Sequence, residues 1–163
     1  MENYLAHEIE LYSPESFQTL LDHEVHRSRR YKHPITLIHI SVEADPNNPE
    51  TQHGAEVFAI NALNLEVRET DIPCRKGSEF LLLLPFTDEH GARNVCERLE
   101  KMFRISHQTY DRVSFQVSAF IGLTSATGDP PLSGNKLMRQ AFDALQYAQT
   151  HHSSNAVLFS EIT

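Results

Sequence analysis

Two apolar runs separated by a short polar turn constrain the fold of this chain most strongly. The runs are Ile72 to Cys74 and Glu79 to Leu84, and the turn between them, Arg75 to Ser78, contains the sequence Lys-Gly-Ser. A glycine between two short β-forming segments is typical of a hairpin, because glycine readily adopts the positive φ that tight turns require. We therefore predict a β-hairpin in the middle of the chain.

The rest of the chain predicts helices and strands in alternation. Ser13 followed by Pro14 is typical of a helix start, since serine caps free amides and proline fits the first helical position. The continuous apolar run Ile35 to Val42 predicts a buried strand. Residues 45–54 are rich in turn formers and predict a loop. Further helices are expected at about 55–68, 87–103 and 137–149, and further strands at 113–124 and 156–159.

Composition narrows the class of protein. We expect residues 1–163 to form a single domain, because a chain of this length can bury a core of its own. The net charge of −8 argues against binding to nucleic acid or to an anionic membrane. Two cysteines give no disulfide framework, and no apolar run approaches the length of a membrane span. We expect a cytoplasmic protein that does not insert into a membrane.

A second feature lies around the predicted hairpin. Arg68-Glu-Thr-Asp71 precedes it, Lys76-Gly-Ser-Glu-Phe80 spans its turn, and the following apolar strand ends at Pro85. This region resembles the bacterial GGDEF domains, the diguanylate cyclases that join two GTP molecules into cyclic di-GMP. There an R-x-x-D motif precedes a G-G-(D/E)-E-F hairpin. The resemblance covers essentially the whole chain and implies an α+β, nucleotidyl-cyclase palm-like fold, with a mostly antiparallel sheet of about five strands flanked by helices.

The resemblance also identifies positions at which this sequence departs from the family. Active members end the first strand in Asp-x-Asp and place an acidic residue in the hairpin, and these carboxylates hold catalytic metal ions. The matching positions here are Ser41, Val42 and Glu43 in the strand, and Gly77, Ser78 and Glu79 in the hairpin. A serine hydroxyl is a poor Mg²⁺ ligand beside a carboxylate. We therefore predict a degenerate active site, no cofactor, no bound metal and no enzymatic activity.

The chain contains ten histidines, and histidine is a common metal ligand. No cysteine or acidic partner completes a four-ligand set in the sequence. His39 falls within the apolar strand and is expected to be a hydrogen-bonded interior histidine or one at the rim of the domain.

The R-x-x-D motif carries the functional prediction. Arg68 and Asp71 are three residues apart, so both side chains can converge on one ligand: an aspartate accepts from the N1–H and N2 amino edge of guanine, and an arginine binds a phosphate or the O6/N7 edge. In the family this is the inhibitory cyclic di-GMP site. A second arginine on the next helix completes it, and that position corresponds to Arg98.

We therefore predict a non-catalytic cyclic di-GMP receptor or adaptor with a protein partner, in which the ligand can also link two copies of the domain. The alternative is an interaction module that binds a protein and no nucleotide, in which Arg68 and Asp71 form only a surface ion pair.

Overall fold

The computed structural model describes residues 11–44, 48–104, 108–110, 112–128 and 132–162. The helices are α1 (Pro14–Tyr31), α2 (Pro49–Glu66), α3 (Glu89–Phe103), α4 (Gly134–Thr150) and the short 3₁₀ helix η2 (Phe159–Glu161). The strands are β1 (Ile35–Glu43), β2 (Ile72–Lys76), β3 (Glu79–Pro85), β4 (Gln108–Tyr110), β5 (Val113–Phe115), β6 (Ser118–Ala126) and β7 (Val157–Leu158).

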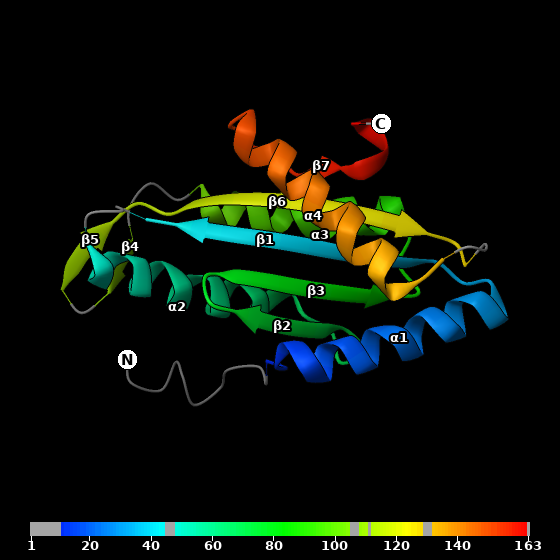
Figure 1. Cartoon of the computed structure of the whole chain (residues 1–163). Coiled ribbons are helices and arrows are strands. Elements are labelled where there is room, and N and C mark those ends of the chain that lie inside the picture. Colours follow the sequence, from blue (N-terminus) through cyan, green and yellow to red (C-terminus); the bar gives the residue numbers. More distant parts are fainter. Residues whose placement is uncertain (1–10, 45–47, 105–107, 111, 129–131, 163) are drawn as a thin grey trace.

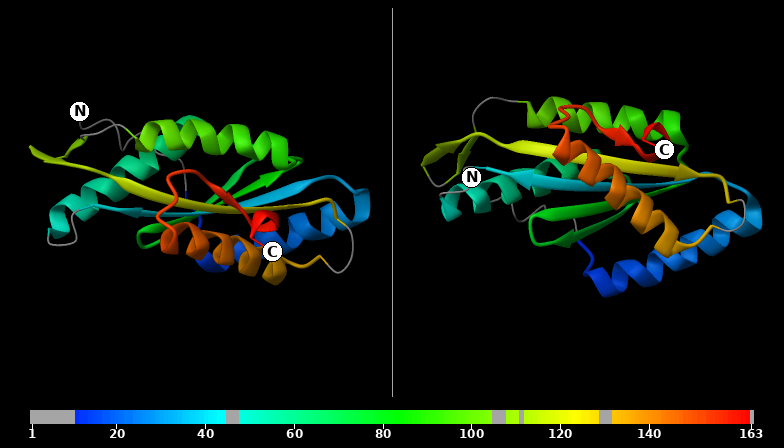
Figure 2. Two further views of the ribbon diagram at one scale, coloured as in Figure 1. Left: turned by 90° about the horizontal axis from the view of Figure 1, so that it is seen from above. Right: turned by 45° about the horizontal axis from the view of Figure 1, so that its top comes forward.

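A five-stranded sheet in the order β2-β3-β1-β6-β7 forms the centre of the molecule, as Figure 1 shows. Every pair in it is antiparallel except the short parallel pair β6–β7. Helices cover both faces, with α2 and α3 on one side and α1 and α4 on the other (Figure 2). The predicted α+β fold class, with a mostly antiparallel sheet flanked by helices, is confirmed. Within the described residues, none of the helices has the length and apolar character needed to cross a bilayer.

The alternation of side chains along β1 divides the core into two layers. Ile38, Ile40 and Val42 pack toward α2 and α3, whereas Ile35 and Leu37 pack toward α1 and α4. Successive side chains of a strand point to opposite faces, so a strand covered on both sides becomes continuously apolar. This is why β1 reads as an uninterrupted hydrophobic run.

Helix caps account for most of the observed boundaries. The Ser13 side chain accepts a hydrogen bond from Ser16 N and Pro14 begins α1, as predicted. The predicted loop at 45–54 was too long, because Asn48 caps α2 by accepting from Glu50 N, and Pro49 takes the first helical position. Residues 45–47 of that loop lie outside the described residues.

The strand predicted at 113–124 is divided in two. Residues 113–115 form β5, which pairs with β4 in a separate two-stranded sheet, and β6 begins at Ser118. Alternating apolar residues indicated a strand, but they carried no information on the change of partner between the two segments.

Close packing fixes α4 on the sheet. Its predicted apolar stripe (Leu137, Ala141, Ala144, Leu145 and Ala148) is buried throughout. Gly122 of β6 lies directly beneath, and a Cβ there would come within 2.1 Å of Leu145 N and 2.7 Å of Ala141 O. The helix therefore sits at a distance that only glycine allows.

Candidate functional site

The sequence-predicted site residues lie at opposite ends of the sheet. In the β1–β3 register, Ser41 pairs with Glu79 at one end and Ile35 pairs with Pro85 at the other. The two pairs are six residue steps apart along β1, which corresponds to roughly 20 Å. The hairpin turn lies at the first end, while Arg68 and Asp71 precede the start of β2 at the second (Figure 1).

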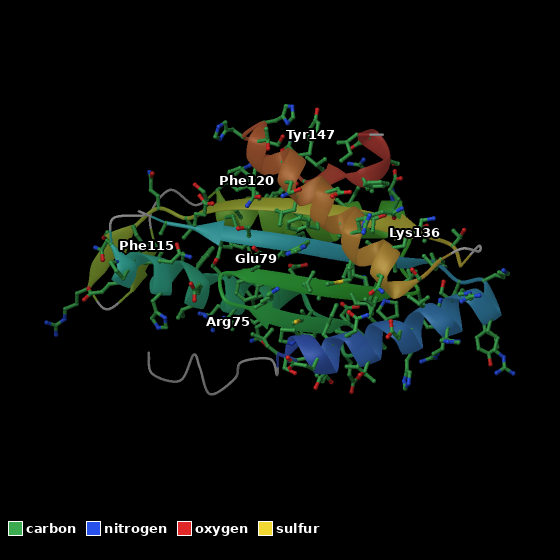
Figure 3. All side chains as sticks on the ribbon, in the orientation of Figure 1. Arg75, Glu79, Phe115, Phe120, Lys136 and Tyr147 are labelled. Carbon is green, nitrogen blue, oxygen red and sulfur yellow. The ribbon has the colours of Figure 1, made fainter. Side chains whose placement is uncertain are left out.

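The hairpin end brings the predicted active-site positions together. The two central residues of the turn are Gly77 and Ser78. Gly77 has a φ of +63°, as the first central position of a type II′ turn requires. Val42 N donates to the Ser78 carbonyl at 3.1 Å, so the turn is tied to β1. Arg75 forms an ion pair with Glu56 of α2 and donates to the Gly77 carbonyl at 3.0 Å. Figure 3 labels Arg75 and Glu79 on this hairpin.

His39 occupies the interior of this end and contacts the hairpin. Its Nε2 lies 2.7 Å from Glu79 Oε1, while its Nδ1 is buried with no hydrogen-bond partner among the described residues. Burial lowers the pKa of His39, although the contact with Glu79 opposes that shift. His39 is thus interior as predicted, and only one of its two ring nitrogens pairs with a described residue. A cavity of about 300 Å³ lies beside it, lined also by Lys76, Arg139 and Phe142.

The donor set at this end does not fit the family's metal site. Ser41 is buried and uncharged, Glu43 is exposed, and Glu79 is engaged by His39. Within the described ranges, no three His, Cys, Asp or Glu side chains come together as a metal ligand set would require. Metal-assisted phosphoryl chemistry needs several oxygen ligands around the ion. We assign no metal-dependent step to these residues.

Arg68 and Asp71 form a closed turn at the other end of the sheet. Asp71 N donates to the Arg68 carbonyl at 3.0 Å, and Arg68 N donates to Asp71 Oδ2 at 2.9 Å. The two residues are therefore held together through the backbone, and the carboxylate is fixed in position. Burial raises the pKa of Asp71, while its hydrogen bond from Arg68 and the Arg68 charge act in the opposite direction.

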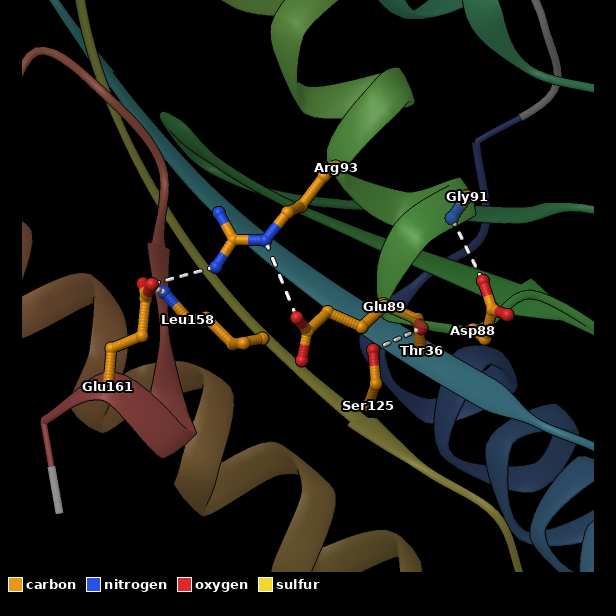
Figure 4. Close-up of polar contacts among 8 residues, drawn as sticks. All are labelled: Thr36, Asp88, Glu89, Gly91, Arg93, Ser125, Leu158 and Glu161. Atoms are coloured by element: carbon orange, nitrogen blue, oxygen red, sulfur yellow. Dashed lines mark hydrogen bonds and ion pairs between the residues drawn. The ribbon is translucent and has the colours of Figure 1, made fainter.

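A cavity of about 170 Å³ lies next to this turn. Arg68 and Asp71 line it together with Pro34, Phe86 and the start of α3. Asp88 caps that helix by accepting from Gly91 N at 2.9 Å, and Arg93 lies between Glu89 at 3.6 Å and Glu161 at 2.8 Å (Figure 4). These contacts fix one wall of the cavity relative to the rest of the domain.

Arg98, the third predicted ligand of the site, does not line this cavity. Its Nε donates to Glu66 Oε1 at 2.5 Å, and its side chain is 47% exposed. Glu66 is the last residue of α2, two positions before Arg68. The structure therefore brings Arg98 to the helix end that leads into the Arg68–Asp71 turn, where Glu66 holds its guanidinium.

Sequence reasoning missed three residues at this end of the sheet. They are Glu66, which pairs with Arg98, and His33 and Phe86, whose rings stack with centroids 3.9 Å apart. The Phe immediately after Pro85 was a usable signal, because an aromatic residue between a strand and a helix cap has no strand or helix face to occupy. Nothing in the sequence pointed to Glu66.

Comparison with known proteins identifies the family. The family model described as diguanylate cyclase, GGDEF domain, matches residues 52–155. The chain therefore belongs to the GGDEF domain family, as the resemblance had implied. No curated protein matches this chain.

Solved structures agree with this assignment. One similar structure is that of the diguanylate cyclase SiaD of Pseudomonas aeruginosa in complex with its activator SiaC. It superposes with a TM-score of 0.80 at 25% sequence identity, and the match covers 91% of this chain but only 58% of SiaD. The GGDEF domain of DgcB from Caulobacter crescentus, in complex with c-di-GMP, gives 0.75 at 16% identity, over 91% and 89%. The active GGEEF domain of a Vibrio cholerae diguanylate cyclase gives 0.77 at 15%, over 92% and 98%.

These matches contradict the prediction that the protein is not an enzyme. The family is that of the diguanylate cyclases, and an active cyclase domain is among the structures that share the fold. The prediction rested mainly on serine at two metal-ligand positions, Ser41 and Ser78. Two substituted positions do not decide the class of a domain that matches the family over residues 52–155, and the carboxylates of Glu43 and Glu79 remain at that end of the sheet.

Proposed function

We propose that this GGDEF domain is a receptor for cyclic di-GMP and binds it at the Arg68–Asp71 turn. The observation that carries the proposal is the closed geometry of that turn beside a cavity. A carboxylate fixed by the backbone before the ligand arrives loses little conformational freedom on binding. Asp71 then accepts from the N1–H and N2 amino group of a guanine, and Arg68 donates to a phosphate or to the O6/N7 edge.

The charges around the turn support an anionic ligand. Among the described residues, none forms an ion pair with the Arg68 guanidinium, so its donors are available. Arg98 becomes available by exchanging Glu66 for a ligand phosphate. That exchange leaves the Glu66 carboxylate, whose side chain is only 10% exposed, without its partner, so it opposes binding.

A protein partner is the second element of the proposal. The SiaD structure contains an activator protein, and the DgcB structure contains c-di-GMP. By analogy, we propose that ligand at the Arg68–Asp71 turn alters the binding of a partner protein, or of a second copy of this domain. Sedimentation with and without cyclic di-GMP tests the second case, because an unchanged monomer at saturating ligand excludes linked copies.

The proposal is tested by equilibrium binding of labelled cyclic di-GMP, with GTP turnover followed chromatographically in the same preparation. We expect wild type to bind and Arg68→Ala to bind about 10- to 150-fold more weakly, since a charge-assisted hydrogen bond contributes about 1.5–3 kcal/mol. The matched control is Arg104→Ala, which removes an exposed arginine at the far end of α3. If wild type does not bind cyclic di-GMP at high micromolar concentrations, the receptor function is rejected. The alternative, an interaction module that binds a protein and no nucleotide, then takes its place.

A further inference from the structure

Phe86 is an aromatic side chain that the core of the domain does not use. It is 59% exposed, although its neighbours Leu84 and Pro85 are buried. It also has a φ of +56°, in the left-handed region that glycine and asparagine normally occupy. A left-handed backbone costs a residue with a Cβ roughly 1–2 kcal/mol. Such strain on an exposed apolar residue points to a use outside the core.

The Phe86 ring is held in place from one side. The imidazole of His33 stacks on it, with centroids 3.9 Å apart and an angle of 29° between the ring planes. His33 is itself buried, its Nδ1 lies 3.4 Å from the Pro34 carbonyl, and its Nε2 has no hydrogen-bond partner among the described residues. The imidazole therefore serves here as a packing surface, and the exposed part of the Phe86 ring faces away from it.

Phe86 also lines the cavity that Arg68 and Asp71 border. The cavity is therefore lined by an arginine, by an aspartate whose carboxylate is fixed by the backbone, and by a phenylalanine that is 59% exposed. These groups match three features of a purine nucleotide: the phosphate, the hydrogen-bonding edge and the π-face of the base. Tyr31, which is similarly exposed, contacts Arg30 and lines none of the cavities described above.

We propose that Phe86, supported by His33, is the stacking residue for a guanine base bound at the Arg68–Asp71 turn. This inference rests on the proposed function, and it assigns to Phe86 a contact that the R-x-x-D motif does not include. The hydrogen bonds of Asp71 select the edge of the base, and the ring fixes the plane in which that edge lies. Stacking of a base on an aromatic side chain contributes about 1–3 kcal/mol.

The test compares Phe86→Ala, Phe86→Leu and Phe86→Trp by calorimetric titration with cyclic di-GMP. We expect Ala and Leu to weaken binding by about 5- to 150-fold and Trp to retain it, because only Trp restores a π-face. Phe86 is exposed, so all three variants should fold, which their melting curves will check. Raising NaCl should reduce the effect of Arg68→Ala, since salt screens charges, and leave the effect of Phe86→Ala unchanged.

The outcomes separate this inference from the function on which it depends. If wild type binds and Phe86→Leu binds equally well, the stacking role is refuted while the receptor function stands. If Phe86→Trp binds as weakly as Phe86→Ala, an aromatic face is not what the ligand requires, and the inference also fails. If wild type itself does not bind, the proposed function fails and the inference fails with it.

Discussion

Arg98 of α3 donates to Glu66 at the end of α2 across 2.5 Å, so an acidic residue holds the third predicted ligand of the Arg68–Asp71 site. The Arg98 side chain is 47% exposed, whereas that of Glu66 is only 10% exposed. Under the proposed function, cyclic di-GMP therefore competes with Glu66 for the guanidinium. This competition makes Glu66 a determinant of affinity although it contributes no contact of its own.

Glu66→Gln should tighten cyclic di-GMP binding by about fivefold or more, because it removes a carboxylate that is only 10% exposed and that would lose its partner when Arg98 binds the ligand. Arg98→Ala should weaken binding by about 10- to 150-fold. Calorimetry on the two single variants and the double variant measures both effects. A gain from Glu66→Gln that persists without Arg98 would show that Glu66 acts on the ligand directly.

The pH dependence of binding should follow Asp71. Burial raises the pKa of its carboxyl above the usual 3.8, and the protonated acid no longer accepts from the guanine edge. Affinity should therefore fall as the pH decreases, and the fall should begin at a higher pH than for an exposed aspartate. Binding titrations at a series of pH values from pH 7 downward measure this decrease. Asp71→Asn should bind more weakly at pH 7 and show a flatter profile, whereas an equal slope in both proteins would assign the dependence to another group.

The free energy of unfolding should decrease as the pH falls, because of His39. Burial places the folded-state pKa of His39 below the unfolded value of 6.5, so the unfolded chain binds more protons between these two values. The stability contributed by neutral His39 is complete above about pH 6.5 and is lost as the pH falls through the folded-state pKa. Urea unfolding from pH 7.5 to pH 5 should therefore show declining stability.

Two substitutions serve as controls for this stability prediction. His39→Gln should flatten the decline, and His26→Gln, at an exposed position of α1, should leave it intact. If the decline survived in His39→Gln, a different group would be responsible for it.

The packing of α4 on β6 predicts that alanine substitutions at two glycines will differ sharply in their effect on stability. A Cβ at Gly122 would meet helix backbone at 2.1 Å, so Gly122→Ala forces α4 outward and should destabilise the domain by about 1–3 kcal/mol or more. Gly91→Ala, in the first turn of α3, has 3.1 Å to the Thr87 methyl group and should change stability by less than about 1 kcal/mol. Urea denaturation compares the two, and similar losses would mean that the α4–β6 contact is looser than described.

Local chemistry made much of the fold predictable from the sequence. The Ser13 cap, the hairpin glycine and the continuous apolar run of β1 each depend on neighbours within a few residues, and each was located correctly. The start of α2 was misplaced because Asn48 and Pro49 were taken as turn residues, although the same residues also begin helices.

The candidate site was predictable only in part, for a related reason. Arg68 and Asp71 are neighbours in the chain and form one turn, so their proximity followed from spacing. The Glu66–Arg98 pair and the His33–Phe86 stack join residues far apart in the sequence, and only the packing of α3 beside α2 and of β1 beside β3 brings them together. The Nδ1 of His39 has no hydrogen-bond partner among the described residues, a consequence of burial that no sequence pattern indicated.

The central claim is that the Arg68–Asp71 turn binds cyclic di-GMP, and calorimetric titration of wild type beside the Arg68→Ala and Asp71→Ala variants tests it most directly. The predicted result is saturable binding to wild type, a 10- to 150-fold loss in Arg68→Ala, and a loss of preference for cyclic di-GMP over cyclic di-AMP in Asp71→Ala. Binding to wild type that neither substitution weakens would contradict the site, and no heat at high micromolar ligand would contradict the function.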